Sequence, residues 1–261
     1  MPISPRRTGV WRSSSGRAES AVREAVGHLS ELDPQAHIVV HCRSGSRSAN
    51  HAILSDRLRA ALAAIDAANG GDPHTILLRG ERRPKELAHA ELVSEWIEKL
   101  APGASEALRI AGRAHHLRRW VIPRADYPQG REGYLRWRRA LHDFHAEQTA
   151  AILDACGYDA ALIRRVSDLL HKRGLARRES EAQVLEDALC LVFLETQYRE
   201  IAERLSEEKL LDVTAKTLRK MSERAKALAL ELPLDARDAA TIRRAAGLSI
   251  PLAKESFRGR S

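Results

Sequence analysis

Apolar residues recur at three- and four-residue spacing along most of the chain, which is the pattern of helices with one buried face. Two short apolar runs, 37–41 and 74–78, predict strands. The pattern as a whole predicts an all-α protein with a short βα unit near the N-terminus. The predicted helical segments are 17–32, 49–68, 84–100, 105–120, 131–156, 159–173, 179–206, 207–231 and 236–246.

The same pattern divides the chain into four parts. Residues 1–16 are rich in Arg and Ser and are expected to form a disordered arm. Residues 17–55 contain the first strand, residues 56–235 form the main helical body, and residues 236–261 form a C-terminal helix and tail.

Composition narrows the class of protein. A hydrophobic content of 44% in 261 residues is enough for a buried core, which excludes global disorder. No apolar run approaches the roughly 20 residues of a membrane helix, and the N-terminus lacks the apolar segment of a secretory signal. Three cysteines cannot build a disulfide framework, so we expect a cytoplasmic protein. The net charge of +8 fits an anionic ligand, and it equally fits an Arg-rich proteome.

The most specific local motif is IVVHCRSGSRSA, which places Cys42 in a loop between a strand and a helix. Backbone N–H groups and the start of a helix lower the pKa of a cysteine in such a loop and favour the thiolate. The loop, with its four residues between Cys42 and Arg47, resembles the active loop of the rhodanese family. The resemblance covers about residues 29–55 and implies sulfur transfer through Cys42 if the loop is active.

The helical body contains the stretches AAIDAANGGDP, ERRPKELAHAE, RAHHLRRWVIPR, YPQGREGYLRWR, FHAEQTAAIL, LEDALCLVFLE and KTLRKMSERAKALALELPL. Together these stretches resemble the family called domain of unknown function 4202, over about residues 57–233. The family name implies no activity, so any chemistry must come from the residues themselves.

The order of His, Glu and Asp residues on these helices also resembles the HD superfamily of metal-dependent phosphohydrolases. In that fold, His residues from successive helices and a late Asp converge on one or two metals. The resemblance implies His89, His116, His145 and Asp187 as metal ligands and Glu147 as a catalytic residue. Such a site would hold a divalent metal (Mn, Fe, Zn or Mg) that activates water for attack on a phosphate ester.

One position departs from the HD pattern. Leu117 follows His116, where an HD enzyme has the Asp that holds its metals. A single-metal site, a site without metal, or an iron site with an extra carboxylate such as Glu86 or Glu91 then remain open; oxygenases use the HD fold in this last way. Helical periodicity favours His115 facing the core, whereas the family resemblance favours His116.

Arginines and aromatic residues gather around a proline-containing loop that follows residue 118. Arginine binds phosphate through two parallel hydrogen bonds, and aromatic rings stack on bases. The expected anion-binding residues are Arg119, Arg124, Arg136 and Lys172, and the expected neighbours of the site are His115, Glu91, Glu186 and Trp120.

These patterns predict a metal-dependent hydrolase of HD type that acts on a small phosphorylated or nucleotide-like anion. One alternative is a non-catalytic module that binds a nucleotide or RNA through the basic loop. The others are a sulfurtransferase-linked protein that uses Cys42 and an iron oxygenase on the HD fold. We expect no membrane partner, and a homodimer stays open.

Overall fold

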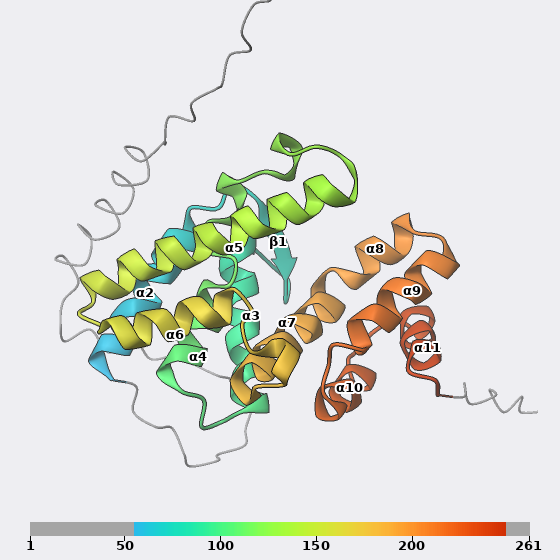
Figure 1. Ribbon diagram of the computed structural model, residues 1–261. Helices are drawn as coiled ribbons and strands as arrows, with labels where there is room; N and C mark the ends of the chain where they lie inside the picture. Colours follow the sequence, from blue (N-terminus) through green and yellow to red (C-terminus); the bar gives the residue numbers. More distant parts are fainter. Residues whose placement is uncertain (1–54, 249–261) are drawn as a thin grey trace, which may run out of the picture.

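The computed structural model describes residues 55–248 of the chain. The predicted arm, the Cys42 loop with its strand, and residues 249–261 lie outside the described residues. Between residues 55 and 248 the chain is mostly helical, with one small antiparallel hairpin (Figure 1), so the predicted helical class is confirmed. The helices are α2 (Asp56–Gly70), α3 (Lys85–Leu100), α4 (Glu106–Ala114), α5 (Gly130–Ala155), α6 (Ala160–Leu170), α7 (Ser180–Thr196), α8 (Tyr198–Arg204), α9 (Glu207–Leu218), α10 (Glu223–Leu230) and α11 (Ala236–Ala245); the strands are β1 (Thr75–Leu78) and β2 (Glu81–Pro84).

Two helices occupy the centre of the fold. α3 packs against α7, and α2 and α4 pack against α3, while α5 and α6 pack against each other as an outer layer. α10 packs on α7, and α11 packs on α9, which places the C-terminal helices on the other side of α7 (Figure 1). None of the helices in this part of the chain has the length and apolar character that crossing a bilayer requires.

The core depends on a close approach between α3 and α4. Val93 and Ile97 of α3 are almost fully buried, and they face Gly112 of α4. A Cβ atom at Gly112 would clash with Ile97 Cδ1, so the glycine sets the distance between the two helices. This contact matters for the site because α3 and the end of α4 both carry its residues.

α4 ends at Ala114, six residues before the end of the predicted helix at residue 120. The reason is a hydrogen bond from the Arg118 N–H to Asn69 Oδ1 at 3.0 Å, made while Arg118 has a left-handed backbone with φ of 52°. Asn69 is fully buried near the end of α2. Because its carbonyl oxygen takes the Arg118 N–H, the chain turns after α4 and His116 lies in that turn.

Asp72 fixes the other segment of the site in a similar way. Its buried carboxylate accepts the His74 N–H at 2.9 Å and the Glu86 N–H at 3.0 Å. It therefore caps the first turn of α3 from a distance, since Pro84 offers no side-chain cap. The β1–β2 hairpin lies between these two bonds and turns through Arg79 and Gly80, which both have positive φ. The predicted strand near 74–78 is confirmed; β2 was not predicted.

Two long predicted helices are each divided in the structure. The segment 179–206 breaks at Gln197 into α7 and α8, and the segment 207–231 breaks before Ser222 into α9 and α10. Asp187 causes the second break: it accepts the Ser222 N–H at 2.8 Å and the Ser222 hydroxyl at 2.5 Å. The Ser222 hydroxyl oxygen in turn accepts the Ala225 N–H and begins α10.

Asn69→Ala tests the turn after α4. The substitution removes the acceptor of the Arg118 N–H in a partly buried turn, and we expect the free energy of unfolding to fall by about 1–3 kcal/mol. Gln129→Ala is the control, because Gln129 is exposed and makes no capping hydrogen bond, and it should change stability by less than about 0.5 kcal/mol. Urea denaturation of both variants measures the difference. Equal stabilities would show that Asn69 does not hold the turn.

Candidate metal centre

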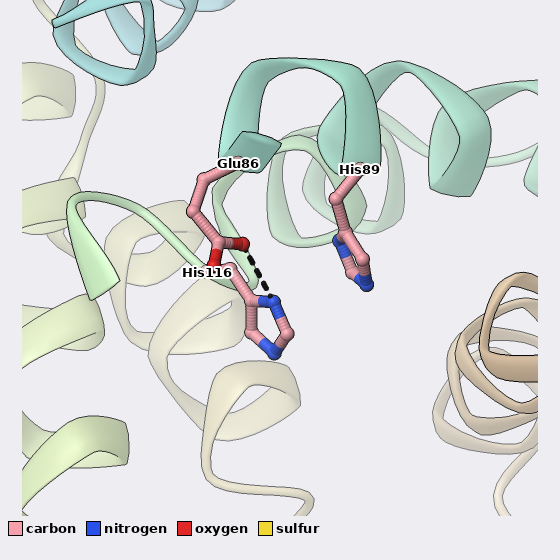
Figure 2. A group of neighbouring side chains, drawn as sticks. All are labelled: Glu86, His89 and His116. Carbon is pink, nitrogen blue, oxygen red and sulfur yellow. Dashed lines mark hydrogen bonds and ion pairs between the residues drawn. The ribbon is translucent and has the colours of Figure 1, made fainter. Parts of the chain in front are cut away.

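Three side chains converge on one point beside the start of α3. The ligand atoms of Glu86, His89 and His116 all lie within 4.8 Å of one another, so this group could hold a metal ion. Figure 2 shows Glu86 and His89 on α3 with His116 approaching from the turn after α4. Glu86 and His89 are three residues apart, which places them on the same face of the helix.

The hydrogen bonds of His116 define the state of its ring. Its Nδ1 lies 2.9 Å from Glu86 Oε2, so Nδ1–H donates to the carboxylate (Figure 2). Its Nε2 lies 3.2 Å from Arg119 Nη1 and accepts from that guanidinium, since arginine offers only donors. Arg119 also lies over the ring of Trp137, 4.8 Å from its centre. The Trp137 indole N–H donates to the Ile122 carbonyl at 2.9 Å, which holds the loop against α5.

Three imidazoles lie close to that of His116. The ring centres of His89 and His115 are 4.3 and 4.7 Å from that of His116, and the His145 ring centre is 6.1 Å away. His145 donates from Nδ1 to the Leu117 carbonyl at 2.9 Å, which leaves Nε2 as a bare acceptor. His145 Nε2, His89 Nδ1 and His115 Nδ1 are buried with no hydrogen-bond partner among the described residues. Unpaired buried nitrogens are costly, and a metal ion satisfies such nitrogens well.

Burial keeps this cluster uncharged. It lowers the pKa of His89 and that of His145 to about 3, and it lowers the pKa of His115 and His116 well below 6.5. The neutral imidazoles that result are the form that binds metals. Burial also raises the pKa of Glu86 to about 7, although the nearby Arg119 acts in the opposite direction.

The centre opens into a small pocket with a volume of about 100 Å³. Ile76, Leu78 and Leu92 form its apolar wall, and Lys85 and Arg119 bring two positive charges to it. Its size suits a metal ion with its remaining ligands, or one phosphate group.

The structure brings together two of the four predicted ligands, His89 and His116, and leaves His145 at the edge of the group. The third member is Glu86, which the sequence indicated only as an extra carboxylate. The prediction that His115 faces the core is confirmed, because the residue is 7% exposed.

The predicted carboxylates other than Glu86 lie elsewhere. Asp187 is outside the group, because both of its oxygens are used to hold Ser222. Glu147 is exposed on α5, whereas His145 on the same helix is buried, so Glu147 faces solvent and not the centre. Glu91 forms an ion pair with Arg83 at 2.5 Å.

The predicted anion-binding residues also separate. Only Arg119 lines the pocket, and Lys85 is the second cation there, which the sequence did not single out. Arg124 donates to two loop carbonyls, those of Tyr127 and Pro128, at 2.8 and 2.9 Å.

The other predicted residues lie away from the pocket lining. Arg136 is exposed on α5, and Trp120 is partly buried in the short turn of residues 119–121. Lys172 forms an ion pair with the buried Glu186 at 2.5 Å.

Glu86 and Lys85 could have been found from the spacing in ERRPKELAHAE. A carboxylate three residues before a His at the start of a helix places two metal donors on one face. The preceding lysine then lies beside them. This sequence signal is short. It becomes specific for a metal site only when a third donor, His116, lies close to it in the folded chain.

The sequence matches the domain of unknown function (DUF4202) family over residues 59–242. The chain belongs to this family. No curated protein and no solved structure matches it. The matched range of the DUF4202 family includes the whole Glu86–His89–His116 group and both buried residues, Asn69 and Asp72, that position it.

His145→Gln tests the buried neutral imidazole. A histidine whose folded pKa is about 3 supplies stability that is present above pH 6.5 and is lost as the pH falls toward 3. Between about pH 7.5 and 5.5, His145 takes up a proton in the unfolded state and stays neutral in the folded state. This difference should lower the free energy of unfolding by about 1.4 kcal/mol. We therefore expect the stability difference between wild type and His145→Gln to change by that amount, measured by urea denaturation at both pH values.

The comparison must be made between variants, since the raised pKa of Glu86 acts in the opposite direction. Its contribution rises as the pH falls through about 7, and it is common to both proteins. A difference between the two proteins that stays constant with pH would contradict the burial of a neutral His145.

Proposed function

We propose that this protein is a metal-dependent phosphohydrolase that acts on a small phosphorylated or nucleotide-like anion. The observation that carries the proposal is the convergence of Glu86, His89 and His116 in a pocket that also contains Lys85 and Arg119. The centre offers metal ligands, and the two cations offer binding for an anion.

The donor set fits a catalytic metal. Two imidazoles and one carboxylate are the protein ligands of known hydrolytic zinc sites, which keep a further position open for water or substrate. A metal held there would lower the pKa of its bound water and polarise a phosphoryl oxygen. The succession of His89, His116 and His145 along the chain supports the HD-like arrangement. Leu117 in place of an Asp supports one metal instead of two.

The side chains of the pocket supply the rest of the chemistry. Lys85 and Arg119 offset the charge of a phosphate group, and the guanidinium offers paired donors to its oxygens. The apolar wall of Ile76, Leu78 and Leu92 limits the water around the reacting group. In the reaction, the oxygen of water forms a bond to phosphorus, the ester P–O bond breaks, and the leaving oxygen takes a proton.

His89→Ala and Asp187→Ala form a matched test of the ligand set. We expect wild type and Asp187→Ala to bind a divalent metal equally, because Asp187 lies outside the group and accepts its hydrogen bonds from Gln183 and Ser222. His89→Ala removes a ligand, and we expect it to lose more than roughly 100-fold in metal affinity, beyond the cost of a second-shell change. Elemental analysis and calorimetric titration measure both. Asp187→Ala should be less stable by about 1–3 kcal/mol.

Phosphate release from a panel of phosphomonoesters and nucleotides tests the reaction. We expect the metal-loaded wild type and Asp187→Ala to release phosphate and His89→Ala to be at least roughly 100-fold slower. A wild-type protein that binds no divalent metal and releases no phosphate would exclude the proposed function.

The same donor set favours a second candidate, an iron-dependent oxygenase. Two histidines and one carboxylate with open positions are the ligands of non-haem Fe(II) oxygenases. Loading with Fe(II) or Zn²⁺ separates the two functions. A hydrolase releases phosphate with Zn²⁺ and consumes no oxygen, whereas an oxygenase consumes oxygen with Fe(II) alone.

A further inference from the structure

Arg119 occupies an unusual place for a cation, because it touches a ligand of the candidate metal centre. Its Nη1 lies 3.2 Å from His116 Nε2 and donates to it. The only other ring nitrogen of His116, Nδ1, is bonded to Glu86. Both nitrogens of this ligand are therefore engaged by neighbouring side chains.

A ring nitrogen has one lone pair, which serves either a hydrogen-bond donor or a metal. Arg119 therefore opposes a metal on either nitrogen of His116. It uses the lone pair of Nε2 directly, and a metal on Nδ1 would leave the single ring proton on Nε2, where it would face the guanidinium donor. Its positive charge also repels a cation, and burial of the site strengthens that repulsion. While Arg119 stays in place, the centre binds metal more weakly than its three ligands would allow.

An oxyanion would relieve this competition. A guanidinium makes shorter and stronger hydrogen bonds to a phosphate than to a neutral imidazole. Lys85 lies in the same pocket and adds attraction for an anion there. The Trp137 ring, 4.8 Å below the guanidinium, gives Arg119 a surface on which to turn from His116 toward that anion.

We propose that Arg119 opposes metal binding at the centre until an oxyanion of the phosphate class binds its guanidinium and draws it away from His116. We call this role of Arg119 the latch. When the anion binds the guanidinium, the conflict at His116 Nε2 is removed and the ring can bind the metal, so metal and oxyanion bind cooperatively. The latch rests on the metal site and the substrate class of the proposed function. Because coupling between two ligands is reciprocal, the metal must also tighten binding of the anion by the same factor.

The test is titration of the metal-free chain with Mn²⁺, with and without inorganic phosphate, with free Mn²⁺ measured by electron paramagnetic resonance. In wild type we expect phosphate to tighten Mn²⁺ binding about 5- to 150-fold. Arg119→Gln should bind Mn²⁺ more tightly than wild type without phosphate, and phosphate should then add much less. In Arg119→Gln, direct contact between the bound metal and phosphate would account for the small gain in Mn²⁺ affinity that remains.

Arg177→Gln is the matched control for lost charge. Arg177 is exposed, and its side chain has no hydrogen bond or ion pair within residues 55–248, so this variant should behave as wild type. Arg119→Lys keeps the charge without the paired donors and should lie between wild type and Arg119→Gln. It also carries the test if Arg119→Gln does not fold.

The remaining outcomes distinguish failure of the latch from failure of the proposed function. If Arg119→Gln binds Mn²⁺ no more tightly than wild type without phosphate, or gains equally from phosphate, the latch is wrong. If esters are hydrolysed all the same, the proposed function survives that failure. Coupling through Arg119 without ester hydrolysis would retain the latch and overturn the hydrolase. Absence of Mn²⁺ binding in every variant, with and without phosphate, would overturn both.

Discussion

Two buried polar side chains at the end of α2 hold the segments that build the centre. Asn69 accepts from the Arg118 backbone, and Asp72 accepts from the Glu86 backbone. Buried N–H groups are costly to leave unpaired, so each bond fixes its segment strongly. Because the two acceptors are three residues apart, one in the last turn of α2 and the other just after it, the positions of Glu86 and His116 relative to each other depend on that short stretch. The stretch belongs to AANGGDP, one of the motifs that carry the family resemblance.

The histidine cluster shows how burial selects chemistry. Imidazoles packed ring to ring repel each other when protonated, and their removal from water adds to that cost. Both effects keep the rings neutral, so each ring has one nitrogen whose lone pair is available to a metal. The positive charges at the pocket then come from Lys85 and Arg119, which line it. The neutral imidazoles, which suit a cation, therefore lie close to two positive side chains, which suit an anion.

Local sequence patterns located the main helices well, and long-range contacts explain where they failed. The helix predicted over 84–100 is observed as Lys85–Leu100, because its apolar stripe and its boundaries are local. The end of α4 was missed, since the acceptor for Arg118 comes from Asn69, far away in the sequence. Asp187 was interpreted as a metal ligand because it takes the place of the late Asp in the resemblance to the HD superfamily. Only the structure shows that Ser222 takes both of its oxygens.

At the base of the hairpin, the carboxylate of Asp72 accepts the backbone N–H groups of both His74 and Glu86. The turn of the hairpin at Arg79 and Gly80 lies at the far end, and Ile76 and Leu78 face the pocket from one strand. The hairpin is thus a module whose length and apolar side chains can diverge while Glu86 stays where Asp72 holds it. The shape and polarity of the pocket wall can therefore change through this insert without any movement of Glu86.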